Sequence, residues 1–111
     1  MANNFQLQFR FVRTYDGKVI DFEDSKHRNY KTLASAIKAG TKNFNGNNSR
    51  QPIASVKKCY KKDGWRTVEC LRYFAEDGNE VRLGEEYTTI RTEVARVVDR
   101  ETQDVLWELT A

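Results

Sequence analysis

The sequence is poor in residues that mark special structures, with one proline, two cysteines, one histidine and six glycines. So few prolines and glycines leave no flexible linker between domains. The 111 residues, 39% of them hydrophobic, suit a single domain with one modest core. No apolar run reaches the roughly 18 residues of a membrane-spanning helix. The N-terminus lacks the basic and apolar stretches of a signal peptide, so we expect a cytoplasmic protein that does not bind membranes.

Sequence patterns of catalysis and metal binding are also missing. His27 lies in a polar, basic stretch with no recognisable nucleophile pattern beside it. A zinc site needs three or four ligands at suitable spacing, and two cysteines plus one histidine without a close pair do not provide it. Neither a glycine-rich phosphate loop nor a serine-hydrolase elbow occurs. We therefore expect no enzymatic activity, no cofactor and no metal site.

The two cysteines flank a hairpin turn predicted at Asp63-Gly64. If these two residues form the loop, Cys59 lies opposite residue 68 and only diagonal to Cys70. Diagonal neighbours are about 7–8 Å apart, which exceeds comfortable disulfide reach. The same register places Lys58 opposite Glu69. We expect two reduced, half-buried thiols.

What the sequence does contain is a divided charge. Residues 1–62 carry 13 Lys/Arg and 4 Asp/Glu, whereas residues 63–111 carry 6 and 12. Ten basic residues and no acidic one lie between positions 26 and 62: Lys26, Arg28, Lys31, Lys38, Lys42, Arg50, Lys57, Lys58, Lys61 and Lys62. A stretch of one sign indicates a surface that meets a polyanion. The alternative is that the acidic half folds against the basic half and neutralises it.

Alternating apolar and polar residues predict antiparallel strands joined by tight turns. Residues 5–13 alternate over most of their length, and a turn at 15–18 leads to a returning strand at 19–22. Residues 53–60 and 65–74 form the clearest hairpin, followed by a turn at 76–79 and a return at 80–83. The pattern predicts an α+β fold in which about 6–7 strands, a meander of hairpins, pack against one amphipathic helix.

The helix is predicted at about residues 30–45. Its apolar stripe consists of Leu33, Ile37, Gly40 and Phe44. Asn29 or Thr32 can cap its start, and Gly46 can end it in the left-handed conformation. Three lysines, Lys31, Lys38 and Lys42, lie nearly opposite this stripe and face solvent. The polar residues 43–51 are expected to form a loop whose side chains satisfy their own turns or contact phosphates.

The C-terminal residues fit two structures. A helical stripe can be drawn through residues 87–98, but the Val-rich segments 94–98 and 105–109 enclose a polar connector. We favour a final hairpin over a second helix.

These observations predict a small non-enzymatic binding protein that uses a basic face to contact nucleic acid or a nucleoprotein. The expected contact residues are Lys31, Lys38, Lys42, Arg50, Lys57, Lys58, Tyr60, Lys61 and Lys62. Tyr60, with Trp65 across the turn, either offers a stacking surface or simply covers the core. The alternative function is a protein-interaction module or inhibitor of a larger protein that acts through its charged halves. Self-association of the two halves into a homo-oligomer is a further possibility.

Overall fold

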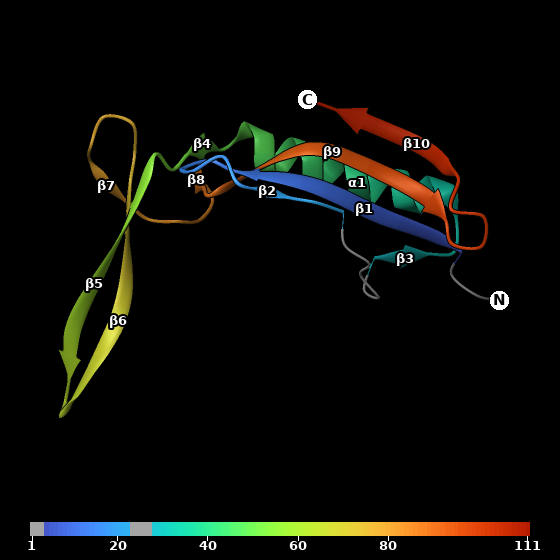
Figure 1. The fold of residues 1–111 in the computed structure, drawn as a ribbon. Coiled ribbons are helices and arrows are strands. Elements are labelled where there is room, and N and C mark those ends of the chain that lie inside the picture. The colour runs from blue at the N-terminus through green and yellow to red at the C-terminus, as the bar shows by residue number, and fades with distance from the viewer. Residues whose placement is uncertain (1–3, 23–27) are drawn as a thin grey trace.

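The computed structural model describes residues 4–22 and 28–111, which form one helix and ten strands in three sheets (Figure 1). The elements are β1 (Phe5–Arg13), β2 (Val19–Ile20), β3 (Asn29–Tyr30), α1 (Leu33–Ser49), β4 (Gln51–Pro52), β5 (Ser55–Asp63), β6 (Arg66–Phe74), β7 (Glu80–Val81), β8 (Tyr87–Thr88), β9 (Ile90–Asp99) and β10 (Val105–Thr110). The predicted α+β class with a single helix is confirmed. Five of the strands have only two residues. Two of them, β2 and β7, are shorter than the returning strands predicted at 19–22 and 80–83, whereas β3, β4 and β8 were not predicted.

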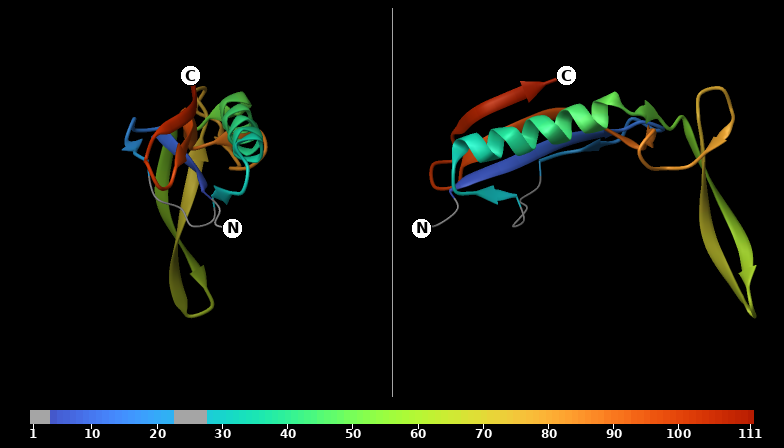
Figure 2. Two further views of the ribbon diagram at one scale, coloured as in Figure 1. Left: turned by 90° about the vertical axis from the view of Figure 1, so that its right-hand side faces the viewer. Right: turned by 180° about the vertical axis from the view of Figure 1, so that it is seen from behind.

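A five-stranded antiparallel sheet forms the body of the protein, in the order β10-β9-β1-β2, with β3 also paired to β1. Leu7 pairs with Val97 and Phe9 with Ala95 across β1 and β9. These side chains project from one face, and α1 covers that face (Figure 2). Ala36 of the helix joins them in a core whose members are at most 3% exposed. The final hairpin, β9 with β10, is confirmed.

The helix begins where one of the predicted caps places it but ends later than predicted. Thr32 is the N-cap, and its side-chain oxygen accepts a hydrogen bond from the Ser35 backbone N–H at 3.1 Å. The helix continues through Gly46 to Ser49, so the predicted loop at residues 43–51 is wrong. Asn48 explains the extension, because its side chain exchanges two 2.9 Å hydrogen bonds with the backbone of Thr92 in β9. Tertiary contacts thereby hold a polar last turn that sequence reasoning assigned to a loop.

Residues 54–86 form an insertion that leaves the body and returns to it at the same place. The short strands β4 and β8 pair in parallel, and the Ile53 backbone N–H donates to the Thr88 carbonyl at 2.9 Å. Thr14 of the body donates its hydroxyl to the Ile53 carbonyl at 2.7 Å. Ile53 itself is fully buried, whereas no residue from 54 to 87 is. The body therefore ends at this junction.

Within the insertion, β5 and β6 form a two-stranded hairpin, residues 55–74, which we call the arm. It projects past the C-terminal end of α1, well away from the body (Figures 1 and 2). The radius of gyration is 17.5 Å, whereas a compact chain of this length has about 13 Å. The acidic half of the sequence does pair with the basic half in the sheets, β9 with β1 and β6 with β5, as the alternative expected. The arm nevertheless carries more basic than acidic residues. His27 and most of the polar segment 23–28 lie outside the described residues.

Gly40 marks the closest approach of the helix to the sheet. A Cβ atom at this position would lie 2.9 Å from Leu7 Cδ1 and 3.0 Å from the Trp107 ring. Gly46, six residues further along α1, has no atom within 4 Å of the corresponding point. Only a residue without a side chain at position 40 lets Trp107 of β10 pack under the helix.

Substituting each glycine by alanine tests this packing. Gly40→Ala should destabilise the fold by about 1–3 kcal/mol, because overpacking outweighs the helix propensity of alanine. Gly46→Ala should stabilise it by up to about 1 kcal/mol, since the same propensity gain meets no obstacle. Urea denaturation followed by circular dichroism measures both. Equal stability of the two variants would contradict the packing described here.

Candidate functional site

The structure divides the nine predicted contact residues into two groups. Lys31 lies one residue before the helix cap, Lys38 and Lys42 lie on α1, and Arg50 caps the helix C-terminus. The other five, Lys57, Lys58, Tyr60, Lys61 and Lys62, all lie on β5 of the arm. All nine are exposed except the half-buried Arg50. The helix group lies on the body, whereas the arm group lies on the hairpin that projects from it. The nine residues therefore do not form one flat face (Figure 2).

In the helix group, two cations flank a shallow hollow on the surface of α1. Lys42 and Arg50 lie at its sides, and Gly46 leaves its floor without a side chain. Asn43 and Asn47 also line it. The Asn47 side chain, however, donates hydrogen bonds to Asn43 and to Thr92, both at 3.1 Å. Asn43 and Asn47 are therefore engaged in hydrogen bonds within the protein, and Lys42 and Arg50 are the groups available to a ligand.

The turn of the arm differs by one residue from the prediction. Asp63 pairs with Arg66, so Gly64 and Trp65 form the loop. Gly64 has a positive φ of 62°, whereas Trp65 does not. A two-residue loop of this kind takes glycine at its first central position, while the predicted Asp-Gly loop needs it at the second. The tryptophan is consequently placed at the very tip.

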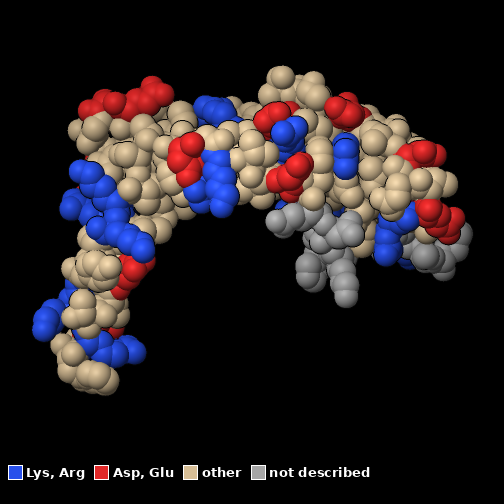
Figure 3. All heavy atoms as spheres, in the orientation of Figure 1, with Lys and Arg blue, Asp and Glu red and all other residues tan. Residues whose placement is uncertain are grey.

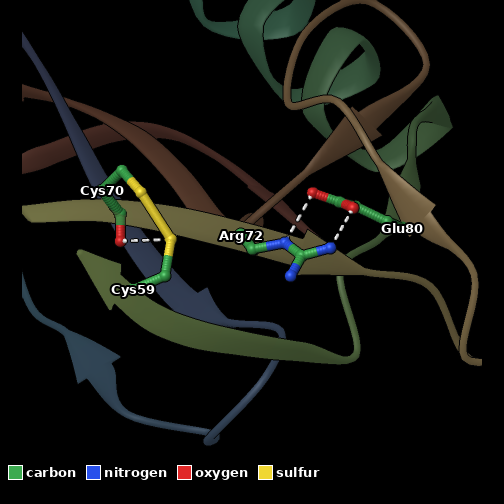
Figure 4. A network of polar contacts seen from close by, with 4 residues as sticks. All are labelled: Cys59, Cys70, Arg72 and Glu80. Carbon is green, nitrogen blue, oxygen red and sulfur yellow. Dashed lines mark hydrogen bonds and ion pairs between the residues drawn. A yellow bond between two sulfur atoms is a disulfide. The ribbon is translucent and has the colours of Figure 1, made fainter. Parts of the chain in front are cut away.

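The corrected register makes Cys59 and Cys70 direct partners. Their Cα atoms are 5.2 Å apart and the sulfur atoms form a disulfide (Figure 4). The prediction of two reduced thiols is therefore wrong, because it placed the cysteines on a diagonal. Disulfides persist most readily in oxidising compartments, and the cytoplasmic location stays an untested prediction.

Cations lie on both faces of the arm. Opposite residues of paired strands share a face and successive residues alternate, so the doublets Lys57-Lys58 and Lys61-Lys62 are each split. One face, the disulfide face, carries Lys57 and Lys61 together with the cystine. The other, the tyrosine face, carries Lys58, Tyr60 and Lys62. A polyanion can therefore be contacted from either side of the ribbon.

Acidic residues pair with half of the arm's cations: Lys58 with Glu69, Arg66 with Asp63 and Arg72 with Glu80. The arm contains six Lys/Arg and two Asp/Glu, a net charge of +4. Of the nine predicted contact residues, only Lys58 forms an ion pair in the part of the chain that the structure describes, with Glu69 at 3.6 Å. That pair is solvent-exposed and is therefore weak. Blue atoms consequently dominate the arm in Figure 3, while a red cluster lies above its base.

Arg72 is the arm cation most firmly engaged within the protein. It donates from Nε and Nη2 to the two Glu80 carboxylate oxygens at 3.0 and 2.6 Å, which fastens β7 to the arm (Figure 4). These hydrogen bonds lower the pKa of Glu80 below its ordinary value and raise the pKa of Arg72. The pair contributes stability above the ordinary carboxyl pKa, and this contribution is lost as the pH falls through the lowered value. Arg72 is thus less available to a ligand than the lysines.

The aromatic side chains of the arm differ in exposure: Tyr73 and Phe74 at its base are half-buried, whereas Tyr60 and Trp65 are exposed. Trp65 is 91% exposed and Tyr60 is 66% exposed. The sequence left open whether Tyr60 and Trp65 face solvent or cover the core, and in the structure they face solvent. The predicted contact set omits Trp65, although its place beside the Gly64 turn was the signal that could have found it.

Comparisons with protein-family models, curated protein sequences and solved structures give no significant match to this chain. Among residues 4–22 and 28–111, no three His, Cys, Asp or Glu side chains cluster in a way that could hold a metal ion. The same residues contain no helix with the length and apolar character to cross a membrane. The geometry of the arm and the helix is therefore the basis for functional inference.

The disulfide should stabilise the outer arm, by which we mean residues 60–69 between the two cysteines. A two-stranded ribbon is at best marginally stable alone, and closing a loop of this size contributes about 3 kcal/mol. In a Cys59→Ser/Cys70→Ser variant we expect amides of residues 60–69 to lose most of their protection from hydrogen exchange. Amides of β1 and β9 should be unchanged, since they belong to the body. Equal protection of the arm in variant and wild type would contradict this role.

The Arg72–Glu80 contact predicts a specific titration. In Arg72→Gln the pKa of Glu80 should rise towards its ordinary value, because the two charge-assisted hydrogen bonds are lost. An NMR titration of the Glu80 carboxyl group measures it. Arg66→Gln removes another arm guanidinium that does not contact Glu80, so it should leave that pKa unchanged. A similar rise in both variants would assign the effect to overall charge instead.

Proposed function

We propose that this protein is a non-enzymatic binding protein whose arm contacts nucleic acid, free or within a nucleoprotein. The observation that supports this most is the net charge of +4 on a ribbon that stands off the body. Phosphate contacts from Lys and Arg supply most of the sequence-independent affinity for nucleic acid. A ribbon with cations on both faces suits a ligand that is charged along its whole length.

Packing accounts for the base of the arm but not for its outer residues. Phe74 is half-buried and its ring centre lies 5.3 Å from Lys57 Nζ, whereas Tyr60, Lys61, Lys62 and Trp65 are exposed. Exposed Tyr, Trp and basic residues together are the composition of interaction surfaces. The helix group adds cations on the body, which we regard as a second and weaker contact because it is separated from the arm.

Two matched triple variants test the proposal. Lys57→Gln/Lys61→Gln/Lys62→Gln neutralises the arm, and Lys31→Gln/Lys38→Gln/Lys42→Gln neutralises the helix group. Neither triple leaves a described acidic partner unpaired, and both remove the same total charge. The arm triple should weaken oligonucleotide binding and lower the slope of log affinity against log salt by about 2–3. The helix triple should change both less.

Fluorescence anisotropy with a labelled oligonucleotide at several salt concentrations measures these effects. Equal losses in the two triples would show that net charge, and not the arm, controls binding. Absence of binding by the wild type at low salt would refute the proposal. The exposed acidic segment 76–86 at the arm base would then favour the alternative, a protein partner with a basic surface.

A further inference from the structure

The outer arm holds the most exposed aromatic groups of the described chain. Trp65, at 91% exposure, forms the tip, and Tyr60, at 66%, lies on the tyrosine face. Leaving a tryptophan in water forgoes the largest apolar burial that any side chain offers. Exposed apolar side chains are ordinary when scattered, but here they gather on the same ribbon as the cations. The tip is therefore built to meet a ligand with both charge and flat apolar faces.

The spacing of these two rings favours unpaired bases. Tyr60 pairs with Glu69, three residue pairs below the Asp63–Arg66 pair that closes the tip. Trp65 lies one residue beyond this pair, so at about 3.3 Å per residue the two aromatic positions are separated by roughly 13 Å along the ribbon. Stacked nucleotides in a duplex rise only about 3.4 Å each. Two rings that stack on separate bases at this distance require a strand that is extended or unstacked.

The energetics point the same way. A base in a single strand can stack on an aromatic side chain without first being unpaired. This stacking does not depend on sequence, because every base has a flat face. The same ring can enter an intact duplex only after neighbouring pairs are unstacked, and that cost offsets the gain. An exposed tryptophan on a ribbon that also carries lysines thus binds single strands more strongly than duplex.

Cations lie where the phosphates of such a strand would run. Lys58 and Lys62 flank Tyr60 on the tyrosine face, and Lys61 lies on the disulfide face near the tip. A flat lipid surface would meet only one face of the ribbon at a time. A flexible strand can follow both, because its backbone can wrap a narrow twisted ribbon.

We propose that the arm selects unpaired nucleic acid, with Trp65 and Tyr60 as stacking platforms and Lys58, Lys61 and Lys62 on the phosphates. This inference rests on the proposed function, since it names which form of nucleic acid the arm prefers. Intact duplex binds only through the cations, and so more weakly and with no contribution from the rings.

Binding of one labelled oligonucleotide, single-stranded and as the matching duplex, tests the preference. Wild type should bind the single strand more tightly. Trp65→Ala should weaken single-strand binding by roughly 5- to 150-fold and leave duplex binding within about twofold. Tyr60→Ala should show a smaller loss of the same kind, while Trp65→Phe should retain most of the affinity. Leu83→Ala is the matched control, because Leu83 is 47% exposed but lies off the arm.

Tryptophan fluorescence supplies a second measurement. Stacking should quench the emission of Trp65 as single strand is added, whereas Trp107, packed beneath Gly40, should not respond. Trp65→Phe should remove the quenched component and keep that of Trp107.

The outcomes separate this inference from the proposed function. Equal affinity for both forms, or an equal loss of both in Trp65→Ala, overturns the preference, while salt-dependent binding that needs the arm lysines leaves the proposed function standing. If Trp65 responds to anionic phosphatidylserine vesicles and to no oligonucleotide, the arm meets lipid and both proposals fail.

Discussion

The pairing of β1 with β9 is the constraint on which the rest of the structure depends. It joins residues from opposite ends of the chain, with Leu7 facing Val97 and Phe9 facing Ala95, and it creates the face that α1 covers. β1, β9 and α1 then supply the apolar core, to which residues 54–86 contribute no buried side chain. Residues 54–86 leave the body and return to it at one junction, where β4 pairs with β8 and Thr14 donates a hydrogen bond to Ile53. The arm is thus a consequence of how the body closes.

An arm without a core is stabilised in other ways. One ladder pairs the facing backbone groups of β5 and β6, the disulfide crosslinks the middle, and Arg72 with Glu80 fastens the base. None of these devices uses the lysines at positions 57, 61 and 62 or the tryptophan at the tip. Stability and ligand contact are therefore assigned to different residues of the same ribbon, so its contact surface can change without loss of the fold.

The fold brings the basic and acidic halves of the sequence together in the body, where β1 pairs with β9, so the divided charge survives in space as the net charge of +4 on the arm. The acidic residues that follow the arm gather near its base, and acidic residues of β9 and its connector lie on the body (Figure 3). Exposed pairs such as Lys58 with Glu69 reduce the arm's field only slightly, because water screens them. The electrostatic field of the outer arm therefore stays positive, which would draw in a polyanion before any specific contact forms.

The sequence by itself determined the α+β class, the single helix with its stripe of Leu33, Ile37 and Phe44 and the strand at β1, and it favoured the C-terminal hairpin over a second helix. These are local patterns whose period matches the element that they form. It also located the basic residues of the candidate site. Tertiary structure alone decided the helix end, because Asn48 bonds to Thr92 more than forty residues away. It alone decided the disulfide too, since a shift of the turn by one residue converts a diagonal pair into direct partners. Exposure of Trp65 and Tyr60 was likewise undetermined by sequence, because only the closure of the body without residues 54–86 leaves them in solvent.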